Sequence, residues 1–204
     1  MARVYDPVCA LVDRAFLDEH RRALASGLEG RVLDLGTGTG RMFDTYAAHS
    51  PGIELHALEP DPAMRARATR RARSIPHTYR IVAGVGERLP YRNDRFDAVV
   101  SSMVLCSVDD PGRVIAEVER VLKPGGEFRM LEHVRSRGWR GYVQDVVAPF
   151  WRRLAGNCRP NRQTEGILAD SGLDPIDEIY DPIVLTPIRP FVRARYRLPH
   201  DQHR

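Results

Sequence analysis

The sequence of 204 residues predicts an α/β protein with a doubly wound, mostly parallel sheet of seven strands and helices on both of its faces. Short apolar runs alternate with helical patterns along the chain, which is typical of consecutive βαβ units. The hydrophobic fraction of 43% and the charged fraction of 28% are those of an ordinary folded domain. Internal repeats and low-complexity stretches are absent, so the sequence excludes solenoid and fibrous architectures.

The expected strands are short and apolar, as parallel strands covered on both faces should be. Five of them are expected at residues 31–35, 53–58, 78–83, 96–102 and 126–132. Two final strands, near 175–181 and 188–197, complete the sheet. Further helical patterns cover residues 7–26, 142–154 and 161–171, with Pro160 helping to begin the last of them.

The helix expected over 110–122 has the clearest signals. Asp110 is a good capping residue, and Pro111 occupies the first helical position, where proline is favoured. Apolar residues fall on one face of this helix at Val114, Ile115, Val118, Val121 and Leu122. The segment Lys123-Pro124-Gly125-Gly126 then ends the helix and turns the chain into the next strand.

Residues 1–204 are expected to form a single domain. Within it, residues 1–28 are predicted to be an N-terminal lid helix, and residues 134–160 an insertion on the substrate side. The longest apolar run, over 96–108, is about 13 residues long and short of the ~20 that cross a bilayer. The first residues lack an apolar signal segment, so a cytoplasmic location is expected.

Charge and cysteine content narrow the function classes. The net charge is +4, but acidic residues are interleaved with the arginines, so nucleic acid is not an expected partner. The three cysteines, Cys9, Cys106 and Cys158, are too few for a disulfide framework. They also lack the local cysteine and histidine spacing of a zinc site, so no metal is expected. The oligomeric state is left open.

The first expected strand runs directly into the glycine loop Gly36-Thr37-Gly38-Thr39-Gly40. Glycines at such a bend let a ligand approach the backbone and its amide hydrogens. The third glycine is one residue early for a dinucleotide fingerprint, and Asp34 would repel a pyrophosphate. The loop therefore predicts a ligand with a cationic or zwitterionic end.

A carboxylate follows the second expected strand. Glu59 is placed to accept both hydroxyls of a ribose, because an ionised carboxyl has two accepting oxygens. Met64 either contacts a purine ring or belongs to the core. The segment 84–90, which leaves the third strand, is placed to close over the base.

Five segments in order resemble the class I S-adenosylmethionine-dependent methyltransferases: DLGTGTG, ALEPDPAM, GERLPY, RFDAVVSSMVL and RVLKPGGEF. This resemblance covers residues 31–132 and implies a Rossmann-like fold with S-adenosylmethionine as cofactor. The implied cofactor-binding residues are Asp34, Gly36, Thr37, Gly38, Gly40, Glu59, Pro60, Met64, Gly86, Glu87 and Ser102. One departure is Val85, which stands where many members carry an acidic residue for the adenine amino group.

The later segments SSMVLCSVDD, RVLKPGGEFRMLEHV, GNCRPNRQT and PIRPF are similar to the microsomal thiol S-methyltransferases of the methyltransferase-like seven family. This similarity implies a small-molecule thiol as the methyl acceptor. Those relatives have an N-terminal hydrophobic anchor, which is not expected here. The predicted substrate-binding residues are Tyr5, Met103, Asn157 and Cys158.

His133 is the predicted catalytic residue. A free thiol has a pKa near 8.5, so a base close to the acceptor would increase the thiolate fraction. His133 follows the fifth strand and titrates in the useful range. The alternative is a histidine hydrogen-bonded into the insertion. Cys106, inside an apolar run, is expected to be core filler.

Other functions remain open on the sequence. An N- or O-methyltransferase acting on a lipid amine, quinone or other small metabolite would suit Phe150, Trp151 and Leu154, with weak peripheral contact to a membrane. An RNA or protein methyltransferase is disfavoured, because the fourth strand leads into SSMV instead of an Asn/Asp-Pro-Pro-aromatic tetrapeptide. The remaining alternative is a regulatory protein that binds the cofactor without catalysing methyl transfer.

Overall fold

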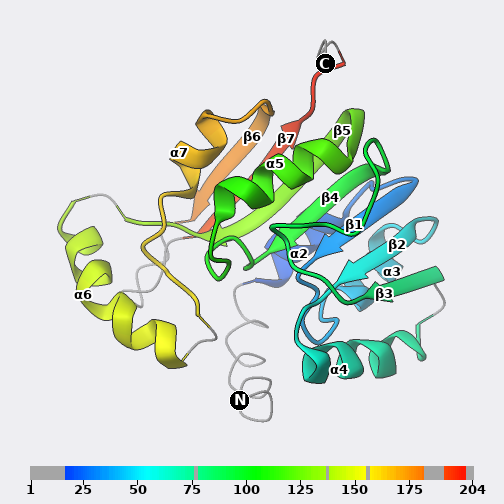
Figure 1. Ribbon diagram of the computed structural model, residues 1–204, viewed down its shortest axis with the longest axis horizontal. Helices are drawn as coiled ribbons and strands as arrows, with labels where there is room; N and C mark the ends of the chain where they lie inside the picture. Colours follow the sequence, from blue (N-terminus) through cyan, green and yellow to red (C-terminus); the bar gives the residue numbers. More distant parts are fainter. Residues whose placement is uncertain (1–16, 76–77, 137, 155–156, 182–190, 201–204) are drawn as a thin grey trace.

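The computed structural model describes residues 17–75, 78–136, 138–154, 157–181 and 191–200. Seven strands form one sheet in the order β3-β2-β1-β4-β5-β7-β6 (Figure 1). They are β1 (Arg31–Leu35), β2 (Glu54–Leu58), β3 (Thr78–Val82), β4 (Phe96–Ser102), β5 (Leu122–His133), β6 (Asp174–Asp181) and β7 (Phe191–Arg197). Strands β1 to β5 pair in parallel, and β7 is antiparallel to both β5 and β6. The predicted fold class is confirmed.

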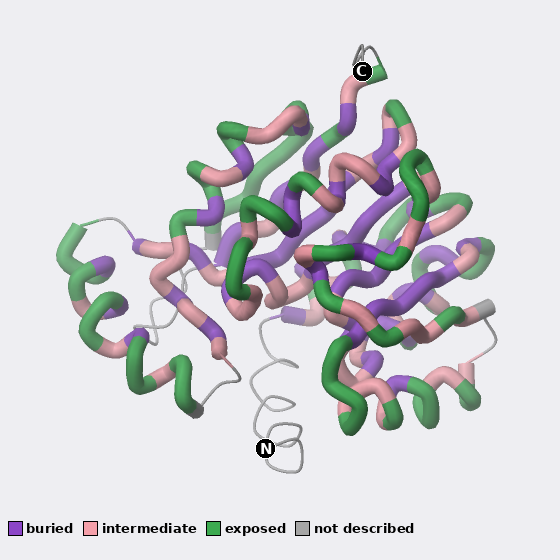
Figure 2. The backbone as a smooth tube through the Cα atoms, viewed as in Figure 1, coloured by how far each residue is buried: buried purple, intermediate pink, exposed green. Residues whose placement is uncertain are grey.

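Helices cover both faces of the sheet. They are α2 (Asp18–Ala25), α3 (Phe43–His49), α4 (Pro62–Ala72), α5 (Pro111–Val121), α6 (Trp139–Leu154) and α7 (Thr164–Ala169). Side chains of α2, α3 and α4 pack in one apolar cluster with Val32, and those of α5 and α7 pack in a second cluster with Leu33. Because neighbouring strand residues face opposite sides, the two clusters lie on opposite faces. Figure 2 shows the central strands buried between them.

Helix α5 forms for the reasons that its sequence indicated. The Asp110 side chain accepts a hydrogen bond from the Arg113 amide at 3.0 Å, and Pro111 begins the helix. The apolar face is fully buried at Val114, Ile115, Val118 and Val121. Helix α4 is capped in the same way, since Asp61 accepts from two amides of its first turn at 2.8 Å.

Some boundaries differ from the prediction. Strand β5 begins at Leu122, four residues early, because Leu122 pairs with Phe96 before the register shifts. Helix α7 begins at Thr164, and Pro160 does not help to begin it. The carbonyl oxygen of Pro160 instead accepts a hydrogen bond from Gln144 Nε2 at 3.3 Å, which ties Pro160 to α6. The predicted leading helix ends in α2, and its first part lies outside the described residues.

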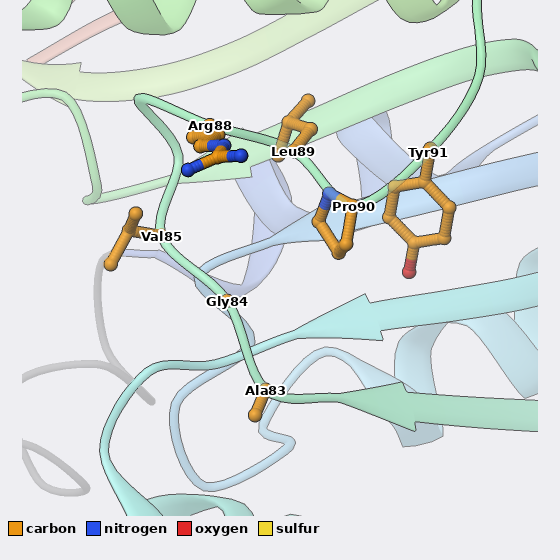
Figure 3. Close-up of a pocket in the computed structure, with 7 residues that line it drawn as sticks. All are labelled: Ala83, Gly84, Val85, Arg88, Leu89, Pro90 and Tyr91. Carbon is orange, nitrogen blue, oxygen red and sulfur yellow. The ribbon is translucent and has the colours of Figure 1, made fainter.

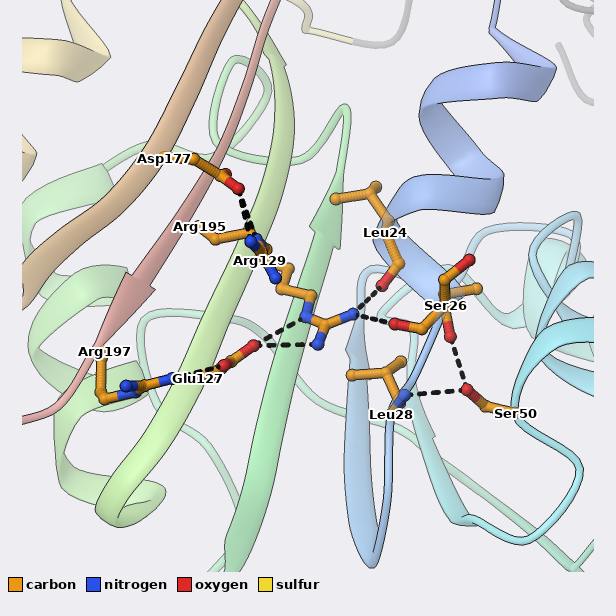
Figure 4. A network of polar contacts seen from close by, with 10 residues as sticks. Leu24, Ser26, Leu28, Ser50, Glu127, Arg129, Asp177, Arg195 and Arg197 are labelled. Atoms are coloured by element: carbon orange, nitrogen blue, oxygen red, sulfur yellow. Dashed lines mark hydrogen bonds and ion pairs between the residues drawn. The ribbon is translucent and has the colours of Figure 1, made fainter.

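A polar network ties α2 to the sheet (Figure 4). The buried guanidinium of Arg129 in β5 donates to the carbonyl oxygens of Leu24 at 3.2 Å and Ser26 at 2.6 Å. It also forms an ion pair with Glu127 at 2.9 Å. These contacts hold the end of α2 against the strand that leads to His133.

The register brings the carboxyl ends of the parallel strands to one edge. Leu35 of β1 pairs with Leu58 of β2 and with Ser101 of β4, and Ser102 pairs with Leu131 of β5. In Figure 1, α6 lies on the side to which the arrowheads of β1 and β2 point. Within the described residues, no helix has both the length and the apolarity to cross a membrane.

Candidate functional site

Asp34 lies in β1 with 2% of its surface exposed. It accepts hydrogen bonds from the hydroxyl of Thr37 and, at 3.0 Å, from the hydroxyl of Tyr46. Burial raises the pKa of Asp34 to about 6, against the two hydrogen bonds, which lower it, and nearby Glu59 raises it slightly further. A buried carboxyl of this kind favours a cationic partner, because the partner stabilises its charged form.

The glycine loop is shaped by positive backbone angles. Gly36, Gly38 and Gly40 have φ values of +63°, +59° and +80°, a region that other residues rarely adopt. A Cβ at Gly36 would lie 2.7 Å from Val104, and one at Gly40 would lie 2.8 Å from Phe43. A Cβ at Gly38 would meet nothing within 4 Å. The loop is therefore tightly packed at both ends and has open space at its centre.

Glu59 connects the glycine loop to the start of α4. It is 6% exposed, and its two oxygens accept from the amides of Gly38 at 2.8 Å and Asp61 at 2.9 Å. Burial raises its pKa, and these amides oppose the shift. Each oxygen keeps a lone pair for a further donor such as a ribose hydroxyl. Beside it, Pro60 is exposed and Met64 is half-buried.

The segment after β3 lines a pocket of about 630 Å³ (Figure 3). Its lining residues are Ala83, Gly84, Val85, Arg88, Leu89, Pro90 and Tyr91. Gly86 is buried, and a Cβ there would approach Val114 of α5 at 3.1 Å. Glu87 Oε1 accepts from the amides of Asp109 at 3.0 Å and Asp110 at 3.4 Å, just before α5. The assignment of Gly86 and Glu87 to the adenine stays a prediction.

Met103 lies directly after β4, the strand that pairs with β1. Its φ of +62° is unusual for a long side chain, and its amide donates to the Leu131 carbonyl at 2.8 Å. Such conformations persist where the surrounding structure holds them, and they are frequent at functional sites. Ser102, the last residue of β4, is half-buried beside it. These positions are compatible with the predicted roles of both residues, which stay predictions.

Glu132 organises the loop between β4 and α5. It has no exposed surface, and it accepts from Ser101 Oγ at 2.8 Å and from three consecutive amides of that loop. The amides are those of Val104 at 2.8 Å, Leu105 at 2.9 Å and Cys106 at 3.2 Å. Sequence reasoning missed this role, although a glutamate inside an apolar strand was the available signal.

Three side chains from separate segments meet at the end of β5. His133 Nδ1 lies 3.6 Å from Cys158 Sγ, which lies 3.6 Å from Cys106 Sγ. His133 is half-buried, its ring packs on Phe191 with centroids 4.7 Å apart, and both cysteines are buried and free. Contact with Cys106 lowers the pKa of the Cys158 thiol, against the effect of burial. This trio, which we call the Cys2His cluster, was not predicted as a unit.

The loop that carries Cys158 is fixed to the loop after β4. Asn157 Nδ2 donates to the Ser107 carbonyl at 2.8 Å, while its Oδ1 accepts from Arg152 Nε at 2.6 Å. The Arg159 amide donates to the Cys106 carbonyl at 2.8 Å. The predicted substrate roles of Asn157 and Cys158 stay predictions, and Tyr5 lies outside the described residues.

Comparison with known proteins gives a family. Residues 33–130 match the family described as "Methyltransferase domain". The chain is 36% identical over 146 residues to human thiol S-methyltransferase TMT1B, covering 68% of this chain and 59% of that protein. It is 36% identical over 102 residues to the demethylmenaquinone methyltransferase of Renibacterium salmoninarum, covering 50% and 40% respectively. The chain thus spans about three fifths of the length of its thiol S-methyltransferase relative.

A solved structure of geranyl diphosphate methyltransferase in complex with SAM has the same fold, with a TM-score of 0.69 and 16% sequence identity. The match covers 88% of this chain and 83% of that one. The residues around the glycine loop fit S-adenosylmethionine, the methyl donor. The open centre of the glycine loop leaves room beside Gly38, buried Asp34 favours a cationic group, and Glu59 has free lone pairs for a ribose. Residues 33–130 therefore belong to the methyltransferase-domain family and carry a site that fits S-adenosylmethionine, and the chain is similar to the thiol S-methyltransferases.

Proposed function

We propose that this protein transfers the methyl group of S-adenosylmethionine to a small-molecule thiol. The observation that carries the proposal is the position of His133 at the end of β5, one strand from Ser102 and two strands from the glycine loop. The similarity to thiol S-methyltransferases supports the same acceptor class.

The chemistry asks little of the protein beyond positioning. Bound S-adenosylmethionine supplies a methyl group on a positively charged sulfur. The acceptor thiol gives its proton to water, and its sulfur bonds to the methyl carbon. The old carbon–sulfur bond breaks with its electron pair left on the donor sulfur, which becomes a neutral thioether. Because two opposite charges disappear, a pocket that excludes water and aligns the groups lowers the barrier. In this proposal Met103 and the Cys158 loop form the pocket, and His133 favours the deprotonated acceptor.

The test is an acceptor panel with purified protein and labelled donor. The panel holds an alkyl thiol, hydrogen sulfide, a lipid amine and a quinol. We expect methylation of the thiols, and its loss in Asp34→Asn but not in Asp44→Asn, whose carboxylate is exposed at 59%. Methylation confined to the amine or the quinol would overturn the thiol assignment and leave the methyltransferase family intact.

A specific surface supports a second candidate, an N- or O-methyltransferase acting on a lipid amine, quinone or other amphipathic metabolite. Helix α6 exposes Trp139 at 71%, Tyr142 at 71%, Val146 at 80% and Phe150 at 73%. Their spacing of three and four residues places them on one helix face. Two arginines lie 5.7 Å from the ring centroids of Trp139 and Tyr142. Aromatic and arginine side chains together favour the surface of an anionic membrane.

Vesicle co-sedimentation tests this surface. We expect the protein to sediment with phosphatidylglycerol vesicles more than with phosphatidylcholine vesicles, and the double variant Val146→Glu/Phe150→Glu to lose this binding. The matched control is Ile179→Glu, which places the same charge at an apolar residue of β6 that is 44% exposed. Equal sedimentation of wild type and double variant would remove the support for a membrane-bound acceptor.

A further inference from the structure

We propose that the Cys2His cluster of Cys106, Cys158 and His133 binds a zinc ion, and that the open coordination position of this ion takes the sulfur of the acceptor. The three ligand atoms all lie within 4.8 Å of one another. Two thiolates and an imidazole are a ligand set that zinc prefers. The second half of the proposal rests on the proposed thiol S-methyltransferase function, whereas the zinc site stands on its own geometry.

The distances fit a tetrahedral ion. With zinc–sulfur bonds of about 2.3 Å and zinc–nitrogen bonds of about 2.0–2.1 Å, two sulfurs lie about 3.8 Å apart and a sulfur and a nitrogen about 3.6 Å apart. The observed separations are 3.6 Å between the sulfurs of Cys106 and Cys158, and 3.6 Å between Cys158 Sγ and His133 Nδ1. These two edges match the tetrahedral values, and the third edge, between Cys106 and His133, is no longer than 4.8 Å.

The three segments that carry the ligands are held in place by bonds outside the cluster. Glu132 fixes the amide of Cys106 and those of the two residues before it. The Arg159 amide, next to Cys158, donates to the Cys106 carbonyl at 2.8 Å. His133 is positioned by strand β5 and by the ring of Phe191. Such outer contacts orient metal ligands and raise the affinity of a site.

A further observation points to thiolates in this position. The indole Nε1 of Trp151 in α6 is buried, and within the described residues it has no hydrogen-bond partner. The group that this indole approaches is the Cys158 thiol, whose pKa is lowered by the contact with Cys106 and also by this approach, although the approach falls short of a full hydrogen bond. An unpaired buried N–H is costly, and a metal-bound thiolate of Cys158 would give it a charged acceptor.

Three protein ligands leave the fourth tetrahedral position of the ion open, as in catalytic zinc sites. Within the described residues the cluster has no fourth ligand, since the nearby Glu132 carboxylate is engaged by four donors. A thiol that coordinates zinc loses its proton to water and remains a nucleophilic thiolate. Its sulfur then bonds to the methyl carbon, and the donor leaves as the neutral thioether. His133 acts in this scheme as a ligand in place of a free base.

The zinc site is tested first, without any activity measurement. Protein that is purified in the presence of zinc and then freed of weakly bound metal should retain about one zinc ion per chain. Cys158→Ser and His133→Gln should lower zinc affinity by more than about 100-fold, beyond the loss that outer-shell changes produce. The matched controls are Ser107→Ala, which lies beside the cluster, and Cys9→Ser, and both should keep the ion. Circular dichroism confirms that each variant is folded.

Equal zinc retention by the wild type and both ligand variants would overturn the site, as would a wild type that retains none under reducing conditions. A Cys106–Cys158 disulfide in freshly purified protein that persists when zinc is supplied with a reductant would also overturn it, because oxidised sulfurs cannot be the ligands.

The role of the open position is tested with cobalt. Co²⁺ in place of zinc should give the intense visible bands of a tetrahedral, thiolate-bound ion, and an alkyl thiol should shift them, whereas a lipid amine should not. Bands that stay unchanged with the thiol would overturn the acceptor role and keep the zinc site. Cobalt bands that shift, in a protein that methylates no thiol in the acceptor panel, would instead contradict the proposed function.

Discussion

The proposed donor side, at the glycine loop, and the proposed acceptor side, at the Cys2His cluster, are built differently. On the donor side, contacts join residues that are near in sequence: Thr37 bonds to Asp34 three positions away, and Gly38 bonds to Glu59 across 21 positions. On the acceptor side, Cys158 meets His133 across 25 positions and Cys106 across 52. The glycine loop and its acidic partners therefore take shape largely within one βαβ unit, with Val104 packed on Gly36 from outside it. The three side chains of the Cys2His cluster come from segments that only the completed fold brings together.

The largest expected effect is on the acceptor side. Glu132→Ala leaves three loop amides and one hydroxyl without their acceptor, so we expect a loss of about 3–4 kcal/mol in the free energy of unfolding. Urea denaturation measures this loss. Glu165→Ala, an exposed glutamate of α7, is the control and should change stability by no more than about 0.5 kcal/mol. A similar loss in both variants would show that Glu132 does not organise the loop.

Two glycine variants separate packing from ligand binding on the donor side. Gly36→Ala should cost about 2–3 kcal/mol in the free energy of unfolding, because a positive φ and a contact with Val104 both oppose it. Gly38→Ala has only the backbone strain and should cost about 1 kcal/mol. It should nevertheless weaken donor binding, measured by calorimetry, because its methyl group would enter the open space of the loop. Unchanged donor affinity in Gly38→Ala would place the donor elsewhere.

The charge of Asp34 should make donor binding pH-dependent. Burial raises the pKa of Asp34 to about 6, so its carboxyl takes up a proton as the pH falls through about 6, and the affinity for a cationic donor should fall with it. Asp34→Asn should bind the donor about 30-fold more weakly at pH 8, which is equivalent to roughly 2 kcal/mol for a charge-assisted bond. The affinity of this variant should not change with pH over the same range. Calorimetric titrations from pH 5 to 8 provide the measurement. A wild-type profile that is flat over this range would contradict the role of Asp34.

The smallest expected effects come from the two helix caps. Asp61→Ala and Asp110→Ala should each lower the free energy of unfolding by about 1 kcal/mol, because each removes a side-chain acceptor at a helix start. Only Asp61→Ala should also weaken donor binding, because loss of this cap loosens the first turn of α4, from which the backbone amide of residue 61 holds Glu59. Equal donor affinity in both variants would show that the start of α4 does not shape the ribose site.

The sequence predicted most of the sheet, because hydrophobic runs and capping residues act locally. The helix signalled by Asp110 and Pro111 was confirmed almost to the residue. The prediction that the last helix begins at residue 161 with the help of Pro160 was wrong, because a hydrogen bond from Gln144 holds Pro160 to α6. Single sequence signals cannot show such a tie, since it depends on how a distant helix packs.

The sequence by itself determined the glycine loop, the acidic residues beside it and the parallel strands that place them at one edge, because backbone preference and short-range hydrogen bonds specify these features. Tertiary structure alone decided that Glu132 holds the loop after β4 and that Cys106, His133 and Cys158 converge. The residues in these contacts come from three separate segments of the chain. Side chains that meet only after the sheet and α6 have packed leave no spacing pattern in the sequence.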